Sequence, residues 1–243
     1  MSKKYSKMKM RIRTGWQDTK NLINHFFDKT DRSYKLQSWP EVIFSCEEDT
    51  LRVELSKPIA LMNWPFKASS SKKKCHILVD GHFTCRAGAD DRIELLSYCT
   101  RIGYFDLESH SNPQSVTPID GYHFDMETDI QRAHPVFHAQ RHEKVLVDKL
   151  TEVNLELYND PPASTLHHVH LPTPQIDLLS ALILLIADHM VCDAETEEGF
   201  FQLARRAREF IPLKANLGNQ AQLSQCIEQS ELLLDHWYAP LTS

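Results

Sequence analysis

The change in hydrophobic period between the middle and the end of this chain constrains its fold more than any other feature. Between residues 41 and 158, short runs rich in β-branched and aromatic residues alternate apolar and polar positions, as half-buried strands do. From residue 174 the spacing becomes helical, over 174–190, 195–210 and 219–238. Because strands come first and helices later, without strand–helix alternation, the pattern predicts an α+β fold with a mainly antiparallel sheet.

A helix is also expected before the sheet region. Within 14–31, one apolar stripe is formed by Trp16, Leu22, Ile23, Phe26 and Phe27. The helix over 174–190 has its own start signal, with Thr173 as N-cap, Pro174 at the first helical position and Asp177 in the first turn. We therefore expect residues 1–243 to form a single domain with an N-terminal helix and a helical C-terminal third.

Turn residues divide the β-rich region into strands. Runs 41–47 and 51–55 are separated by a short polar segment that suits a hairpin loop. Residues 57–74 hold two prolines, a serine triplet and a lysine triplet, which is typical of an exposed connection. The last extended run, 153–158, ends where two consecutive prolines break regular structure.

Two glycines give further local signals. The pair Asp80 and Gly81 predicts a tight hairpin turn between runs 75–79 and 82–86. Gly103 lies within 93–107, which is compatible either with one long bent strand or with two short ones.

The composition excludes several classes of protein. With 243 residues, 42% of them hydrophobic and 25% charged, the chain can bury a substantial core. Its seven glycines form no phosphate-binding loop, and its six cysteines form no Cys-x-x-Cys pair. The N-terminus lacks an apolar signal region, and the longest apolar run, 178–187, is too short to cross a bilayer. We expect a cytoplasmic protein without a membrane segment.

Positive charge is distributed unevenly, although the formal net charge is −6. Two clusters contain the basic residues Lys3, Lys4, Lys7, Lys9, Arg11, Arg13, Lys72, Lys73 and Lys74. Clusters of this kind are usually solvated tails or loops, but they can also contact the phosphates of nucleic acid. A nucleic-acid-binding module is therefore one functional alternative.

Histidine is the residue type that most suggests chemistry. The chain has 13 histidines, concentrated between residues 123 and 170. Because alternate side chains of a strand share a face, His123, Asp125 and Glu127 should project together from run 122–127. The same parity in the run 135–142 predicts one shared face for His134, His138, Gln140 and His142.

Pairing of these two runs as a hairpin would make their polar rows neighbours. Imidazole and carboxylate groups are the usual ligands of zinc, iron and manganese, and they also serve as general acids and bases. The candidate metal ligands are His123, Asp125, His134 and His138. The candidate catalytic residues are Asp125, His134, His138 and His142. The same residues also fit the polar, solvent-facing side of an antiparallel sheet without any chemistry.

Other histidines lie outside this hairpin. A third contribution to the group is possible from His167, His168 and His170. Asp188 and His189, at the far end of the 174–190 helix, are expected to lie elsewhere.

The segment GYHFDMETDIQRAHPVFHAQ, residues 121–140, and the later LPTPQIDLLSALILLIADHM resemble a pattern in uncharacterised bacterial proteins of mobile elements and anti-phage defence islands. That pattern has a Y-x-F-D strand, an H-P-x-x-H-x-Q strand and an L-P-x-P helix start. The resemblance implies a cytoplasmic component of a multi-gene conflict system, but it implies no activity.

Three functions remain open from the sequence. The first is an accessory subunit that docks onto a larger effector protein, because catalytic signatures are absent from the sequence and helices 195–210 and 219–238 are amphipathic. The second is a metal-dependent hydrolase, such as a nuclease or phosphodiesterase, that uses the histidine and carboxylate hairpin. The third is the nucleic-acid-binding module.

Overall fold

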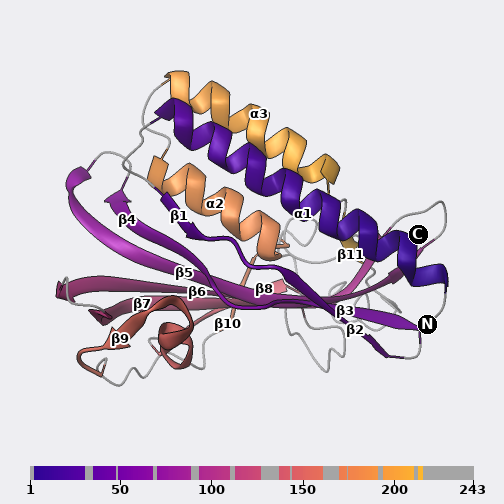
Figure 1. Cartoon of the computed structure of the whole chain (residues 1–243), viewed down its shortest axis with the longest axis horizontal. Helices are drawn as coiled ribbons and strands as arrows, with labels where there is room; N and C mark the ends of the chain where they lie inside the picture. The colour runs from indigo at the N-terminus through magenta and orange to yellow at the C-terminus, as the bar shows by residue number, and fades with distance from the viewer. Residues whose placement is uncertain are drawn as a thin grey trace, which may run out of the picture.

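The computed structural model of the chain describes residues 3–30, 35–47, 49–67, 70–88, 93–109, 113–126, 137–142, 144–160, 170–173, 175–190, 194–210 and 213–215. The helices are α1 (Lys3–Thr30), α2 (Leu178–Met190) and α3 (Ala194–Phe210), with a short 3-10 helix η2 (Val147–Val153). The strands are β1 (Lys35–Ser38), β2 (Val42–Glu47), β3 (Thr50–Leu55), β4 (Ile59–Lys67), β5 (Ser70–Ala87), β6 (Ile93–Ser109), β7 (Gln114–Met126), β8 (Phe137–Arg141), β9 (Leu155–Leu157), β10 (His170–Pro172) and β11 (Leu213–Ala215). A sheet with separate helices confirms the α+β prediction (Figure 1). Among the described residues, no helix has both the length and the apolar character that a bilayer span needs.

Three long strands form the middle of the sheet. β5, β6 and β7 follow one another in the chain and pair antiparallel. The two halves of β5 have different outer neighbours, because β4 pairs with its first half and β3 with its second half. β7 is shared in the same way, with β9 beside its first residues and β8 beside its last ones. The long strands thus join two groups of short strands into one curled sheet (Figure 1).

Two strand pairs among the described residues are parallel, so the sheet is mainly but not entirely antiparallel. β9 pairs parallel to β7, and β11 pairs parallel to β6. A strand returns in the same direction as its neighbour only after a crossover connection. Here η2 lies in the connection that precedes β9, and α2 and α3 precede β11.

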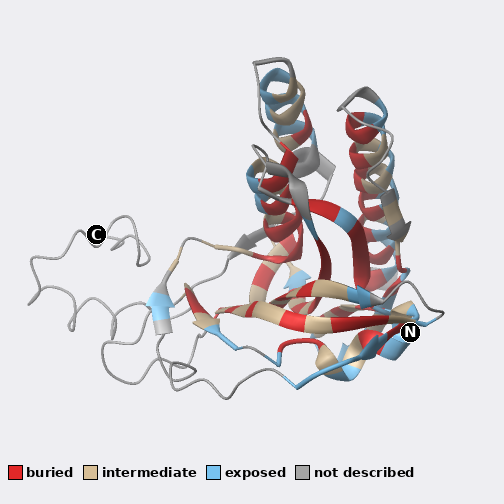
Figure 2. Cartoon of the chain, turned by 90° about the vertical axis from the view of Figure 1, so that its left-hand side faces the viewer, coloured by how far each residue is buried: buried red, intermediate tan, exposed pale blue. Residues whose placement is uncertain are grey.

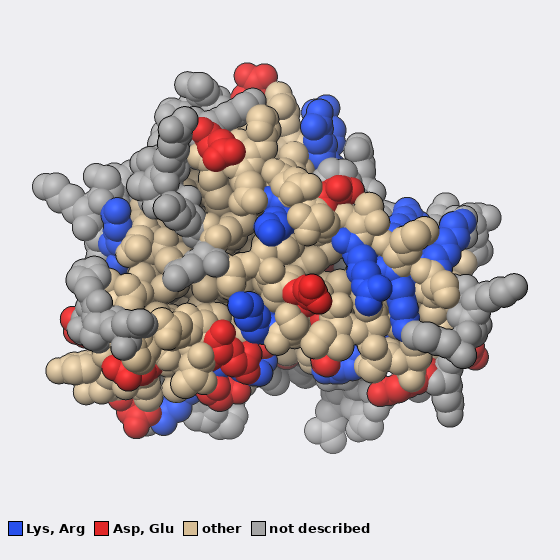
Figure 3. Space-filling model, in the orientation of Figure 1, with Lys and Arg blue, Asp and Glu red and all other residues tan. Residues whose placement is uncertain are grey.

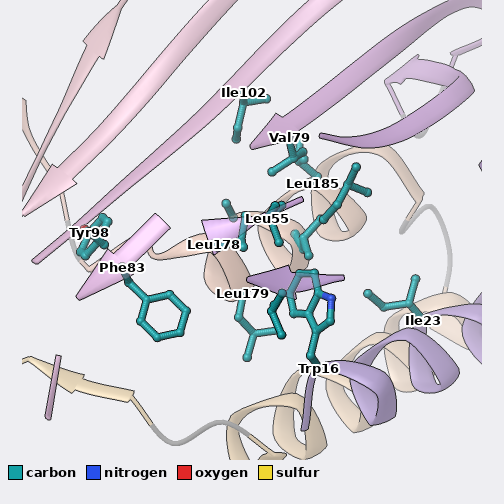
Figure 4. Packing of buried hydrophobic residues seen from close by; sticks show 14 of the residues in the cluster. Trp16, Ile23, Leu55, Val79, Phe83, Tyr98, Ile102, Leu178, Leu179 and Leu185 are labelled. Atoms are coloured by element: carbon teal, nitrogen blue, oxygen red, sulfur yellow. The ribbon is translucent and has the colours of Figure 1, made fainter. Parts of the chain in front are cut away.

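The helices α1, α2 and α3 lie together on one face of the sheet (Figure 1). Buried residues line the surfaces where these helices and the sheet face one another (Figure 2). Residues from α1, α2 and the strands pack together there, among them Trp16, Ile23, Leu178, Leu179, Leu185, Val79 and Ile102 (Figure 4). Full burial of an aliphatic side chain stabilises a fold by about 1.5–3 kcal/mol, so this apolar layer holds the helices in place.

A smaller apolar cluster covers part of the opposite face of the sheet. Its buried members are Ala60, Met62, Leu78, Phe105, Val116, Val145, Leu146, Leu150 and Leu155. The segment that enters η2 and β9 provides the last four of them, and it lies on the side of the sheet away from the three α-helices (Figure 1). We call the side with α1, α2 and α3 the helix face and the other side the open face.

Two glycines allow the chain to cross the open face at close range. Gly103 of β6 and Gly121 of β7 are direct partners in the sheet. A Cβ atom at Gly103 would lie 2.8 Å from the Val145 carbonyl oxygen, and one at Gly121 would lie 2.6 Å from the His142 carbonyl oxygen. Gly103 is therefore needed for close backbone approach, and 93–107 belongs to one strand, β6.

The N-terminal helix is longer than predicted, because α1 begins at Lys3 instead of residue 14. The apolar stripe continues toward the N-terminus through Tyr5, Met8 and Ile12, which are all buried. The basic residues between these positions interrupt the apolar pattern and so hide its period in the sequence; Lys7 is exposed, whereas Lys9 is buried. The N-terminal basic cluster is thus part of a packed helix and is not a solvated tail.

Residues 57–74 are also not an exposed connection. β4 and the start of β5 occupy this stretch, and Ile59, Leu61 and Trp64 are fully buried. Pro65 lies within β4, where the register with β5 shifts on either side of it. A proline is tolerated at such an irregularity, which removes the main sequence argument for a loop.

Asp80 and Gly81 lie in the middle of β5 and form no hairpin turn. A Cβ atom at residue 81 would lie 2.5 Å from the Cys99 carbonyl oxygen, so glycine here permits close approach of β5 and β6.

The start of α2 differs from the predicted cap. The helix begins at Leu178, and the Asp177 carboxylate accepts hydrogen bonds from the backbone N–H groups of Leu179 and Ser180. Asp177 is therefore the N-cap in place of Thr173, while Pro174 lies outside the described residues. The predicted 195–210 helix corresponds to α3, and the predicted 219–238 helix lies outside the described residues. The helical C-terminal third is thus described only as far as α3, and β11 follows it.

Candidate metal centre

The predicted hairpin of the histidine and carboxylate residues is present as β7 and β8. These strands pair antiparallel, with Asp125 opposite His138 and His123 opposite Gln140. The intervening residues Phe124 and Ala139 are buried in the core of the helix face. Since side chains alternate along a strand, the polar residues project onto the open face.

Three side chains from this hairpin converge. His123, Asp125 and His138 each offer one ligand atom, and these atoms all lie within 4.8 Å of one another. The Asp125 Oδ2 atom lies 3.2 Å from His123 Nε2 and 3.9 Å from His138 Nε2. The His138 side chain is 6% exposed, whereas His123 and Asp125 are 21% and 29% exposed. The group therefore has a buried inner ligand and two outer ones that solvent reaches.

Two imidazoles and one carboxylate form a donor set for a divalent transition metal such as zinc, iron or manganese. Three protein ligands leave coordination positions for water or substrate, as in catalytic zinc sites. The same three residues can also form a simple charge-assisted contact when a histidine is protonated. The geometry thus fits both a metal centre and an ion pair.

Neighbouring strands extend the polar row that contains Asp125 and His138. In register across the sheet, Glu54 of β3 pairs with His82 of β5, His82 with Cys99 of β6, and Cys99 with Asp125. Burial is the main cause that raises the pKa of the Cys99 thiol to about 12, and the Asp125 carboxylate, which accepts a hydrogen bond from the thiol, contributes to the same shift. The thiol therefore stays protonated at neutral pH and acts as a donor to Asp125.

A second row of polar residues crosses the sheet beside the first, and on each strand its member lies two residues from the member of the first row. It places Asp80 of β5 beside Arg101 of β6, Arg101 beside His123, and Gln140 of β8 on the far side of His123. Arg101 forms an ion pair with Asp80 through Nη2. The Asp80 side chain is 11% exposed and that of Arg101 is 34% exposed, so the arginine is the accessible member of the pair.

His82 has both arginines and carboxylates as neighbours. Burial lowers the pKa of its imidazole, and the Arg52 guanidinium lowers it further. Arg101 acts in the same direction with a smaller effect, while Glu54 and Asp125 oppose the shift. His82 is therefore a neutral imidazole at neutral pH.

The remaining predicted site residues have different outcomes. His134, His167 and His168 lie outside the described residues, as does Glu127. His142 follows β8, is exposed, and accepts a hydrogen bond at Nδ1 from the Lys144 backbone N–H. His142 is not one of the three residues whose ligand atoms converge, so its predicted catalytic role stays a prediction. His170 is in β10, opposite Gln140.

His189 belongs to a separate place, as expected. Its Nδ1 atom lies 2.8 Å from the Pro65 carbonyl oxygen, and its ring lies near Trp64 and Tyr104. The ring is buried on α2, on the helix face.

The basic residues are carried by α1 and β5. Lys3, Lys4, Lys7, Lys9, Arg11 and Arg13 lie on α1, and Lys72, Lys73 and Lys74 lie on β5. Lys9 and Arg13 stand over the Phe44 ring, with Lys9 Nζ 5.7 Å and Arg13 Cζ 5.0 Å from its centroid. Lys and Arg atoms gather over the N-terminal half of α1 (Figure 3). Part of this charge thus stabilises the contact between α1 and β2.

Sequence reasoning missed the residues that β5 and β6 contribute, namely Asp80, His82, Cys99 and Arg101. Alternation along 75–86 would have placed Asp80 and His82 on one face, had residues 80–81 been taken as strand. The assumed turn at Gly81 broke that parity.

No protein-family model, no curated protein and no solved structure matches the chain. The resemblance to proteins of defence islands therefore stays a prediction.

Proposed function

We propose that this protein is a metal-dependent hydrolase whose single divalent ion is bound by His123, Asp125 and His138. The observation that carries the proposal is the convergence of their three ligand atoms to within 4.8 Å. A bound zinc or manganese ion would lower the pKa of a coordinated water and polarise the bond to be cleaved. Cys99 would hold the Asp125 carboxylate in place as an outer hydrogen-bond donor, a role that neighbours of metal ligands commonly have.

Metal binding is the first test. Protein prepared without a polyhistidine tag is titrated with Zn²⁺ and with Mn²⁺ by calorimetry, and bound metal is counted by elemental analysis. We expect one ion per chain, and we expect His123→Ala and Asp125→Asn each to weaken binding by about 100-fold or more, since each removes a direct ligand. The matched control is His25→Ala, an exposed histidine on α1. Wild-type affinity in the Asp125→Asn variant would exclude this centre.

Hydrolysis is the second test. The metal-loaded protein is assayed with a chromogenic phosphodiester and a chromogenic carboxylic ester. We expect metal-dependent release of the chromophore from at least one of them, and its loss in Asp125→Asn with the fold intact by circular dichroism. Stoichiometric metal binding without any turnover would favour a structural metal site instead.

An accessory subunit is a second proposal. The observation that favours it is the exposure of large apolar residues on the helix layer, with Phe201 of α3 57% exposed and Leu184 of α2 47% exposed. Large exposed apolar residues are candidate anchors for a protein partner. We expect Phe201→Ser to weaken co-purification with proteins encoded beside this one, and Ile43→Ser, a change of an exposed apolar residue on β2, to leave it unchanged. Failure of the wild-type protein to co-purify with any of them would remove this proposal.

A further inference from the structure

The open face carries a cation directly beside the candidate metal centre. Arg101 of β6 is the sheet partner of His123, so their side chains are neighbours on the same face. Among the described residues, the guanidinium of Arg101 hydrogen-bonds to Asp80 alone, through Nη2. Its other N–H groups remain able to donate to a ligand, and the side chain is one-third exposed.

His82 lies in the other polar row, and Arg52 lies on β3 two residues before Glu54 of that row. His82 is two strands away from Asp125, with Cys99 between them. Arg52 lies on β3, where its Nε atom is 3.3 Å from Glu54 Oε2. Both arginines lower the pKa of His82, so both guanidinium groups act on the same imidazole. A neutral imidazole has one nitrogen that donates a hydrogen bond and one that accepts, so His82 can contact a ligand on this face.

The balance of charge depends on the metal. Without an ion, the carboxylates of Asp80, Glu54 and Asp125 outnumber the two arginines. With a divalent ion at Asp125, positive charge exceeds negative charge on this part of the face. The electrostatic field of the open face therefore favours binding of an anionic group only when the metal is bound.

We infer that Arg101 and His82 form a binding subsite for a phosphoryl group of the substrate, next to the metal centre on the open face. This inference rests on the proposed function and specifies its substrate class as phosphate esters. A phosphoryl group offers several oxygens, so one can bind the metal while another accepts hydrogen bonds from the planar guanidinium fork. His82 would contact a third oxygen or the ester group beyond it. Arg101 would thus position the substrate against the ion.

Binding of inorganic phosphate to the zinc-loaded protein tests the subsite. Titration calorimetry is done on the full chain for wild type, Arg101→Gln, Arg101→Lys and Arg86→Gln. Arg86 is the matched control, because it forms a similar ion pair with Glu94 between the same two strands, away from the centre. We expect Arg101→Gln to weaken phosphate binding by about tenfold or more, with zinc affinity changed by less than about threefold.

The other arms separate the possible outcomes. Arg101→Lys keeps the charge beside Asp80 but loses the fork, so it should weaken phosphate binding less than Arg101→Gln and should fold even if Arg101→Gln does not. Acetate should bind more weakly than phosphate to the wild type. Equal phosphate affinity in wild type and both Arg101 variants, or equal affinity for acetate and phosphate, overturns the subsite and leaves the metal centre standing. Absence of zinc binding in the wild type overturns the proposed function, and the subsite with it.

Discussion

The two faces of the sheet differ sharply although alternate residues of the same strands form them, as β5 and β6 show. On the helix face, Val79, Tyr98 and Ile102 are buried in the main core. On the open face, their immediate neighbours Asp80, Cys99 and Arg101 are charged or polar; Asp80 is buried, whereas Cys99 and Arg101 are partly exposed. The residues of the helix face therefore stabilise the fold, while those of the open face can provide polar groups for a functional site.

The largest expected effect comes from shortening a residue of the helix face. Ile102 is 2% exposed, so Ile102→Ala removes buried methylenes and leaves a cavity, at a cost of about 2–5 kcal/mol in the free energy of unfolding. The metal affinity of the folded protein should be unchanged, because Ile102 projects away from His123. Urea unfolding and zinc titration measure the two quantities.

The control for this change is an exposed isoleucine. Ile43 on β2 is 47% exposed, so Ile43→Ala should change the unfolding free energy by no more than about 0.5 kcal/mol. Equal losses at the two positions would contradict the assignment of the core to the helix face.

A smaller effect is expected where the chain crosses the open face. In Gly121→Ala, the new Cβ would meet the His142 carbonyl oxygen at 2.6 Å and Val145 Cβ at 2.8 Å. The crossing segment must then shift, and we expect a loss of about 1–3 kcal/mol of stability by thermal or urea unfolding.

At Gly199 in α3, the same change to alanine is expected to raise the stability of the protein. A Cβ atom there would meet the Phe26 ring at 3.5 Å, which is an ordinary contact. Because alanine favours the helix over glycine, Gly199→Ala should stabilise the protein by about 0.5–1 kcal/mol. A gain at Gly121 would contradict the close approach of the crossing segment, and a loss at Gly199 would contradict the ordinary spacing between α3 and Phe26.

The smallest expected effect concerns pH and the open face. The pKa of His82 is lowered in the folded protein, chiefly by burial, while in the unfolded chain it is about 6.5. As pH falls below about 6.5, the unfolded chain takes up a proton before the folded protein does, so stability falls from that pH downward. Above about pH 6.5 both states are neutral at this residue, and its contribution is constant.

Comparison with a variant isolates the contribution of His82. His82→Gln should lose less stability than the wild type when pH is lowered from about 7.5 to about 5.5, as measured by urea unfolding. His25→Gln, at an exposed position on α1, should follow the wild type. A steeper loss in His82→Gln than in the wild type would mean that the surrounding carboxylates outweigh burial and the arginines.

Local alternation was sufficient to predict part of the candidate site. The parity of 122–127 and 135–142 correctly placed His123, Asp125 and His138 on one face, and the antiparallel pairing of β7 and β8 brought them together. The hairpin over 41–55 and the 195–210 helix were predicted equally well, because each depends on neighbours within a few turns or one loop.

Prediction from the sequence failed where a residue that is typical of a turn or loop is required by contacts with residues far away in the chain. Gly81 looks like a turn residue, but it is glycine because the Cys99 backbone lies against it. The prolines and lysines of 57–74 look like a loop, but Ile59, Leu61 and Trp64 of β4 are buried in the core of the helix face. In both places the deciding partner lies more than a dozen residues away, so propensity alone could not identify it.

The amino-acid sequence by itself determined which side chains share a face on each strand, because that depends only on the two-residue period of extended backbone. Through the helical period of 3.6 residues, it also determined the apolar stripes of α3 and of the part of α1 from residue 14 onward. The tertiary structure alone decided which strands became neighbours, and so placed Arg101, His82 and Cys99 next to the hairpin that carries His123 and Asp125. The physical reason is that register between long strands is set by the packing of whole faces, and no short segment contains that information.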